Sequence, residues 1–263
     1  MSADSAIFTA LPAGRALTRT RSRFYLGMTL TLCAIVLVGF TPTLFGRAAF
    51  QVPKMPGYLY LHGLVTAAWF ALMAVQASLV GRSLALHRQL GWAAIGFAVL
   101  IPVIGMGTQL AIPDRVAAAG IDVTPFRPLI ENVFWLNLFA VTQFTGFVIA
   151  AISLRRRGES HKRLMLFAGI SIIMPAAARF ARWPIFGNQA ADLSLPASTG
   201  REVVFALSTL LLLVGAVAVH DLVKTRRLHR VTWAGAIVMV GTVLLTPVFV
   251  YSDWGKAIVW AVS

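Results

Sequence analysis

The sequence alternates between long apolar runs and short polar segments that are mostly basic. The runs free of Asp, Glu, Lys and Arg are 24–46, 55–81, 89–113, 132–154, 164–178, 203–220 and 231–252. A helix that crosses a hydrocarbon core about 30 Å thick needs roughly 20 mostly apolar residues. Six runs reach or approach this length, and the fifth is short only because Arg179 and Arg182 interrupt it. We therefore predict seven transmembrane helices, at 24–46, 58–80, 90–111, 130–153, 163–186, 203–222 and 231–252.

This pattern predicts an all-α fold, a polytopic transmembrane bundle with a tail at each end. Residues 1–23 form a basic cytoplasmic tail, 24–252 the seven-helix domain and 253–263 a short external tail. The first apolar run has about 23 residues, whereas the apolar region of a cleaved signal peptide has about 7–15. We therefore expect the first helix to be retained as a membrane span.

Composition and charge support this class and predict an orientation. The chain of 263 residues is 58% hydrophobic and only 12% charged, whereas soluble domains carry about 25% charged residues. Its net charge is +14, and its Lys and Arg residues divide fifteen to six between alternate flanks of the spans. Because cytoplasmic loops are enriched in Lys and Arg, this bias places the N-terminus inside and the C-terminus outside. The partner predicted for the basic flanks is an anionic lipid headgroup rather than nucleic acid.

A short histidine motif recurs before the third, fifth and seventh predicted helices. It reads Leu-His-Arg at 86–88, Ser-His-Lys-Arg at 160–163 and Leu-His-Arg at 228–230, each followed by aromatic, Ala and Gly residues. The recurrence predicts a first helix followed by three repeated helix pairs. The alternative is that each motif is an interfacial anchor at the cytoplasmic boundary.

Several of these segments together resemble a known family. The elements are Leu61-His62-Gly63-Leu64-Val65, Trp69, Gln76, Leu86-His87-Arg88-Gln89-Leu90-Gly91 and His161-Lys162-Arg163-Leu164-Met165. They resemble a widespread family of uncharacterised bacterial multispan inner-membrane proteins, over about residues 58–180. The resemblance implies a location in the bacterial inner membrane and implies no activity.

Four histidines are predicted to lie near the cytoplasmic boundary, which makes them candidate metal ligands. They are His87, His161, His220 and His229. Imidazole suits zinc, copper, iron and nickel, and Asp221 could orient or join the ligands. Contact with phospholipid headgroups would explain the same residues. A haem or a divalent metal is therefore a candidate cofactor, although the sequence requires neither, and a single-histidine haem at His62 is a further alternative.

A second polar group is predicted in the outer half of the bundle. The candidate ligand-binding residues are His62, Glu131, Asn132, Arg179 and Arg182. Arg179 and Arg182 are three residues apart and share a helix face. Ionisable groups at this depth normally face the bundle interior and mark functional sites. Two interpretations remain open: a pocket for an anionic or quinone-like ligand, or a structural Glu131–Arg179 pair with Arg182 extended to the surface.

The sequence supports three classes of function. The leading one is a non-enzymatic membrane protein that binds a small anionic or redox-active ligand in an outer-leaflet pocket, with a carrier as one form of it. The second is a metal- or haem-dependent membrane enzyme that uses the cytoplasmic histidines, and the third is a subunit or assembly factor of a larger complex. Retinal proteins are excluded because the predicted last helix contains no Lys for a Schiff base. No catalytic residues are predicted, since the motifs of hydrolases and phosphate-binding loops are absent from the sequence.

Overall fold

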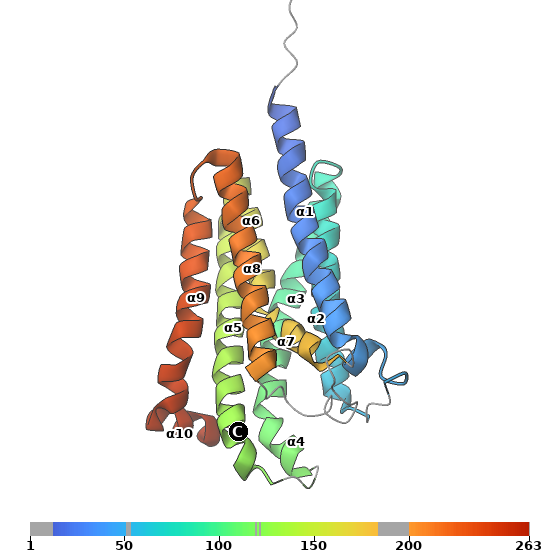
Figure 1. Cartoon of the computed structure of the whole chain (residues 1–263). Coiled ribbons are helices and arrows are strands. Elements are labelled where there is room, and N and C mark those ends of the chain that lie inside the picture. The colour runs from blue at the N-terminus through green and yellow to red at the C-terminus, as the bar shows by residue number, and fades with distance from the viewer. Residues whose placement is uncertain (1–12, 51–53, 119, 121, 184–199, 263) are drawn as a thin grey trace, which may run out of the picture.

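The computed structural model of the chain is a bundle of long helices (Figure 1). It describes residues 13–50, 54–118, 120, 122–183 and 200–262. The fold is all-helical, with 87% helix and no strand among the described residues. Six helices in this part of the chain are long and apolar enough to cross a membrane, and a bent pair of shorter helices makes up to seven.

The helices follow one another with short connections. In chain order they are α1 (Ala13–Phe40) with a π-helical turn (Thr41–Phe45), α2 (Gly57–Leu79), α3 (Leu84–Leu110), α4 (Ile112–Ala118), a 3-10 turn (Thr124–Phe126), α5 (Arg127–Ser153), α6 (Gly158–Ser171), α7 (Met174–Ala178) with a 3-10 turn (Arg179–Arg182), α8 (Gly200–Thr225), α9 (Arg230–Tyr251) and α10 (Asp253–Val262). The boundaries of the six apolar segments that could span a membrane lie within a few residues of the predicted boundaries. For the first of them, this segment is Arg23–Phe45, and α1 itself begins earlier, at Ala13.

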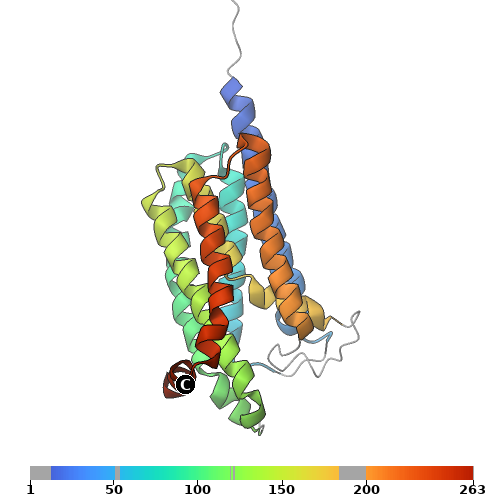
Figure 2. The same ribbon diagram turned by 60° about the vertical axis from the view of Figure 1, so that its left-hand side comes forward.

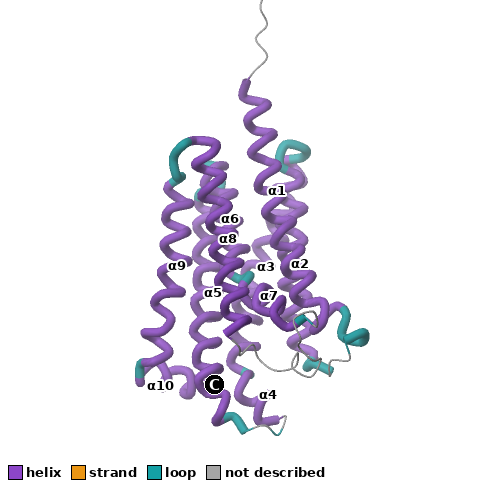
Figure 3. The backbone as a smooth tube through the Cα atoms, viewed as in Figure 1, coloured by secondary structure: helices purple, strands orange, loops and turns teal. Residues whose placement is uncertain are grey.

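Short loops join α2 to α3, α5 to α6 and α8 to α9, so each of these pairs forms an antiparallel hairpin. The loops of the first and third hairpins lie at the end of the bundle where α1 begins, which is the upper end in Figures 1 and 3. The helices α4 and α10 lie at the opposite end, together with the C-terminus.

The core between the helices is apolar and aromatic. Leu32, Trp69, Phe144 and Phe167 are at most 1% exposed and come from α1, α2, α5 and α6. Glycines let these helices approach closely: a Cβ atom on Gly39 of α1 would lie against the backbone of α7. Interfaces between membrane helices are commonly built from small residues in this way.

The segment predicted as the fifth span is broken. The helices α6 and α7 meet at an angle of 45°, and Figure 3 shows the interruption between them. The cause is Pro175, which has no backbone N–H and cannot donate to the carbonyl of Ser171. Because proline fits the first turn of a helix, α7 restarts there. Pro102 and Pro247, by contrast, lie inside continuous helices.

The outer surface of the bundle is largely apolar, with aromatic side chains near both ends. Many Leu, Val and Ile side chains on α2, α3, α8 and α9 are exposed. Trp92 and Trp233, at the starts of α3 and α9, are 77% and 60% exposed, and Tyr251 at the end of α9 is 77% exposed. Aromatic residues prefer the membrane interface. This surface is that of a multi-pass membrane protein.

The predicted external tail is a helix for most of its length. After α9 the chain turns, and α10 folds across the end of the bundle beside α5 (Figures 1 and 2). Gly255 and Val259 face inward and are buried. The Nε1 atom of Trp260 donates a hydrogen bond to Oε1 of Glu131 on α5. This contact ties the C-terminal helix to the bundle.

Candidate functional site

A cavity of about 80 Å³, lined in part by polar side chains, lies between the helices of the bundle. It is lined by His62, Thr66, Ile101, Gly105, Thr108, Gln109, Asn137, Ala140, Val141, Ile172 and Pro175. These residues come from α2, α3, α5 and the junction of α6 with α7. We call it the His62 cavity. One water molecule needs about 10–15 Å³ of such space, so the cavity has room for several waters or for a small molecule.

Three polar atoms around this cavity are buried and make no hydrogen bond within the described part of the chain. They are Nδ1 of His62, Oγ1 of Thr66 and Nε2 of Gln109. Leaving a buried polar group unpaired costs about 1–3 kcal/mol. Three such groups around one cavity therefore indicate a place for water or for a ligand that pairs with them.

Local structure explains how these side chains converge. His62 and Thr66 are four residues apart on α2 and so share a face. Gly105 leaves space opposite them, since a Cβ there would be 3.7 Å from Cε1 of His62. Asn137 on α5 donates a hydrogen bond of 2.7 Å to Oε1 of Gln109, which holds the glutamine side chain in place. The break before Pro175 forms the remaining wall.

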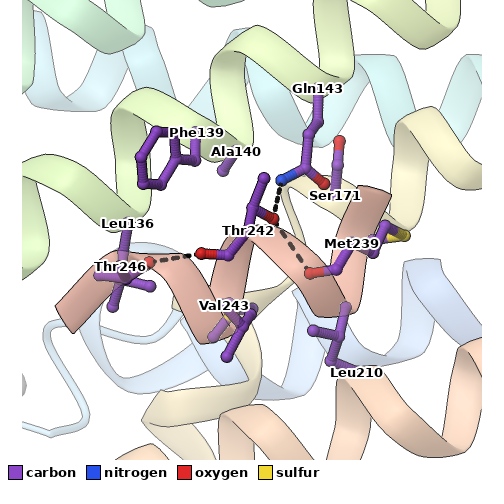
Figure 4. Close-up of a pocket in the computed structure, with 11 residues that line it drawn as sticks. Leu136, Phe139, Ala140, Gln143, Ser171, Leu210, Met239, Thr242, Val243 and Thr246 are labelled. Carbon is purple, nitrogen blue, oxygen red and sulfur yellow. Dashed lines mark hydrogen bonds between the residues drawn. The ribbon is translucent and has the colours of Figure 1, made fainter. Parts of the chain in front are cut away.

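A second, smaller cavity of about 20 Å³ lies on the other side of α5 (Figure 4). Its polar side chains are already paired. Gln143 donates to Oγ1 of Thr242 over 2.6 Å, and the hydroxyls of Thr242 and Thr246 bond to carbonyls of α9. Ser171 likewise bonds to the carbonyl of Ala168. With its hydrogen bonds satisfied, this cavity is a packing defect rather than a second candidate site.

The structure does not bring the five predicted outer residues into one pocket. Only His62 lines the cavity. Glu131 is 7% exposed and accepts the hydrogen bond from Trp260. The guanidinium of Arg127 lies 4.4 Å from the centre of the Trp260 ring. Asn132, next to Glu131 on α5, is half-buried and outside the cavity lining. The reason is that α10 folds back over this part of α5, where its Trp260 donates a hydrogen bond to the Glu131 carboxylate.

Among the described residues, the structure shows no ion pair between Glu131 and Arg179, which was one of the two open interpretations. Arg179 donates to the carbonyl of Pro175 over 2.7 Å, and its guanidinium lies 4.4 Å from the ring centre of Phe40 on α1. The bend before α7 turns this segment toward α1 and away from Glu131. The side chain of Arg182 lies outside the described part of the structure.

The four histidines that were predicted to lie at the cytoplasmic boundary separate into two pairs. His87 and His161 lie with their ring centres 6.5 Å apart. His220 and His229 lie instead on either side of Asp221, with Nδ1 of His220 3.7 Å from the carboxylate. Within the described ranges, no three His, Cys, Asp or Glu side chains are grouped so that they could hold a metal ion. The structure thus does not gather the four predicted ligands at one point.

A buried ion pair between Asp221 and Arg163 lies next to the second histidine pair. Asp221 on α8 is fully buried and accepts from Nη2 of Arg163 on α6 over 2.5 Å. Its other oxygen accepts from Nε of Arg163, from the hydroxyl of Thr232 at 2.6 Å and from the backbone N–H of His229 at 3.1 Å. The carboxylate therefore joins α6, α8 and the start of α9. Burial, and then the charge of Arg163, lower the pKa of His229.

Sequence reasoning missed Thr66 and Gln109 as residues of the cavity. A signal for Thr66 was present, because it follows His62 by one helical turn within an apolar run. Gln109 is likewise a polar amide near the end of an apolar run. Nothing in the sequence shows that these residues face the same space as Asn137, which is on a helix far along the chain.

No protein-family model, curated protein or solved structure matches this chain.

Proposed function

We propose that this protein is a seven-span protein of the bacterial inner membrane that binds a small, oxygen-rich ligand in the His62 cavity. The observation that carries the proposal is the set of three buried, unpaired polar atoms around one cavity within an apolar bundle. Polar groups inside a membrane domain are costly and commonly mark ligand sites or pathways. The ligand supplies the hydrogen bonds that the protein itself does not.

The proposed topology counts the bent pair α6–α7 as one span. The N-terminus is then cytoplasmic, the C-terminus is external, and the helix pairs α2–α3, α5–α6 and α8–α9 correspond to the three repeats. Two observations favour the repeat. The ring of His87 bonds to the carbonyl of Gln76 near the end of α2, and the ring of His161 bonds to the carbonyl of Ala151 near the end of α5.

The chemistry of the cavity favours a ligand that accepts hydrogen bonds. Nε2 of Gln109 is a donor only, and the His62 and Thr66 groups can each donate. Among the described residues that line the cavity, none is Asp or Glu. A carboxylate or a quinone carbonyl meets these requirements, and an organic cation does not.

A pair of glycine variants on α3 tests the proposal. Gly105→Leu places a side chain into the cavity beside His62, whereas Gly107, two residues later, has open space around it and faces outward. We would purify the wild type and both variants and measure the rise in thermal stability produced by benzoate and by a short-chain benzoquinone. At least one probe should stabilise the wild type and Gly107→Leu but not Gly105→Leu. Equal responses of all three proteins would refute a ligand site in the cavity.

A second variant separates binding from packing. Thr66→Val removes one unpaired polar atom and keeps the side-chain volume. It should raise the stability of the ligand-free protein and weaken the response to the effective probe. The physical reason is that an unpaired buried polar group destabilises the free protein and is paired only in the complex.

A further inference from the structure

His87 and His161 occupy equivalent places in two neighbouring helix hairpins. Each is in the first turn of its helix, α3 or α6. Nδ1 of His87 lies 3.3 Å from the carbonyl oxygen of Gln76, and Nδ1 of His161 lies 2.9 Å from that of Ala151. These bonds reach back 11 and 10 residues to the preceding helix. The two hairpins therefore hold both rings by the same contact.

This contact decides which ring nitrogen can bind a metal. A carbonyl oxygen only accepts, so Nδ1 of each ring must carry the proton. The neutral imidazole then has its lone pair on Nε2. Metal-ligating histidines usually have this arrangement, with the second nitrogen bonded to a carbonyl or carboxylate that fixes the tautomer. Both rings are thus prepared as Nε2 ligands.

The third histidine with this sequence motif, His229, has the opposite tautomer. Nδ1 of His229 accepts a hydrogen bond of 3.2 Å from the backbone N–H of Val231, and so caps the start of α9. Its lone pair is used in this bond, and the proton of the neutral ring is on Nε2. His229 therefore has no lone pair to offer, although its sequence neighbours resemble those of His87.

The separation of the rings suits one ion held between two nitrogens. Metal–imidazole bonds of about 2.0–2.1 Å keep two ring centres roughly 5–6.5 Å apart, and the largest values belong to a near-linear arrangement. The centres of His87 and His161 are 6.5 Å apart, with the ring planes at 82°. Zinc would need four ligands, and the described residues offer no group of three His, Cys, Asp or Glu. Monovalent copper accepts two neutral nitrogens in a line.

We propose that His87 and His161 bind a Cu(I) ion between their Nε2 atoms. Lys162, next to His161, is paired with Glu159 at 2.9 Å and lies over the ring of Tyr25 at 4.7 Å, so its charge is partly neutralised. The site is independent of the His62 cavity, because it shares no residue with it.

Competition with a chromogenic Cu(I) chelator under reducing conditions tests the site in the purified full-length chain. Cys33 is the only cysteine and its thiol could also bind Cu(I), so all proteins would carry Cys33→Ser. His87→Asn and His161→Asn are the informative variants, since the Asn amide can keep the bond to the carbonyl but has no second nitrogen ligand. His229→Asn is the matched control.

The parent should bind one Cu(I) per chain, with two nitrogen neighbours in the X-ray absorption spectrum of the complex. Each Asn variant at 87 or 161 should bind more than about 100-fold more weakly, since even second-shell partners change metal affinity by about 10–100-fold. His229→Asn should bind as the parent does. The proposal is overturned if folded His87→Asn or His161→Asn protein retains the parent affinity, or if His229→Asn loses it equally. Melting temperatures near that of the parent would show that the variants are folded.

Discussion

Replacing Asp221 by Ala is the most direct test of how α6, α8 and the start of α9 are held together. Asp221 has no exposed side-chain surface, and Arg163 is 3% exposed. The substitution leaves the guanidinium buried without its main counter-ion and also removes the acceptor for Thr232 and for the backbone of His229. Breaking a buried ion pair by deleting one partner costs about 3–5 kcal/mol.

The contact of Arg163 with Glu159 moderates this loss only slightly. Nη1 of Arg163 lies 2.7 Å from Oε2 of Glu159, but that carboxylate is 43% exposed. Exposed ion pairs contribute about 0–1 kcal/mol. We therefore expect Asp221→Ala to lower the free energy of unfolding by about 3–5 kcal/mol. Asp221→Asn should lose less, because it keeps an acceptor for Thr232.

The assay is reversible unfolding in mixed micelles with increasing SDS, followed by tryptophan fluorescence. Asp114→Ala is the control, because Asp114 is exposed on α4 and the change should stay within about 0.5 kcal/mol. The double variant Asp221→Leu with Arg163→Met should be more stable than the sum of the single losses predicts, since both buried charges disappear together. A loss below about 1 kcal/mol for Asp221→Ala, or strictly additive losses in the double variant, would refute the reasoning.

Three further predictions use the same unfolding assay. Glu131→Gln and Arg179→Gln should show additive losses of stability, because the two side chains have separate partners; a non-additive term above about 0.5 kcal/mol would contradict this. Gly39→Ala should destabilise by about 1–3 kcal/mol through contact with the backbone of α7, whereas Gly27→Ala on the same helix, with open space around it, should not. The lowered pKa of His229 means that its stabilising cap is fully present above the ordinary value of 6.5 and is lost as pH falls through the folded-state pKa. Wild type should therefore lose more stability between about pH 7 and pH 5 than His229→Asn, which keeps a cap but does not titrate.

The local pattern of the sequence was sufficient to predict the six long apolar helices. Apolar length decides whether a segment can span a membrane, and the helices that the structure shows lie within a few residues of the runs free of charge. The break in the fifth span also had a local cause, since Pro175 removes a backbone donor whatever surrounds it. His62 could be selected as a site residue because a polar side chain within an apolar run is costly wherever it lies.

Which residues meet was decided by the tertiary structure alone. Glu131 was expected to face Arg179, but α10 folds back and places Trp260 against it. The motif around His87 and His229 is nearly the same in sequence, yet one ring bonds to a carbonyl of the preceding helix and the other caps its own helix. Such contacts depend on helix rotation and tilt, which are set by packing between segments far apart in the chain. Hydropathy determines which segments form long apolar helices, and the packing of their side chains determines which polar atoms are paired and which are left unpaired.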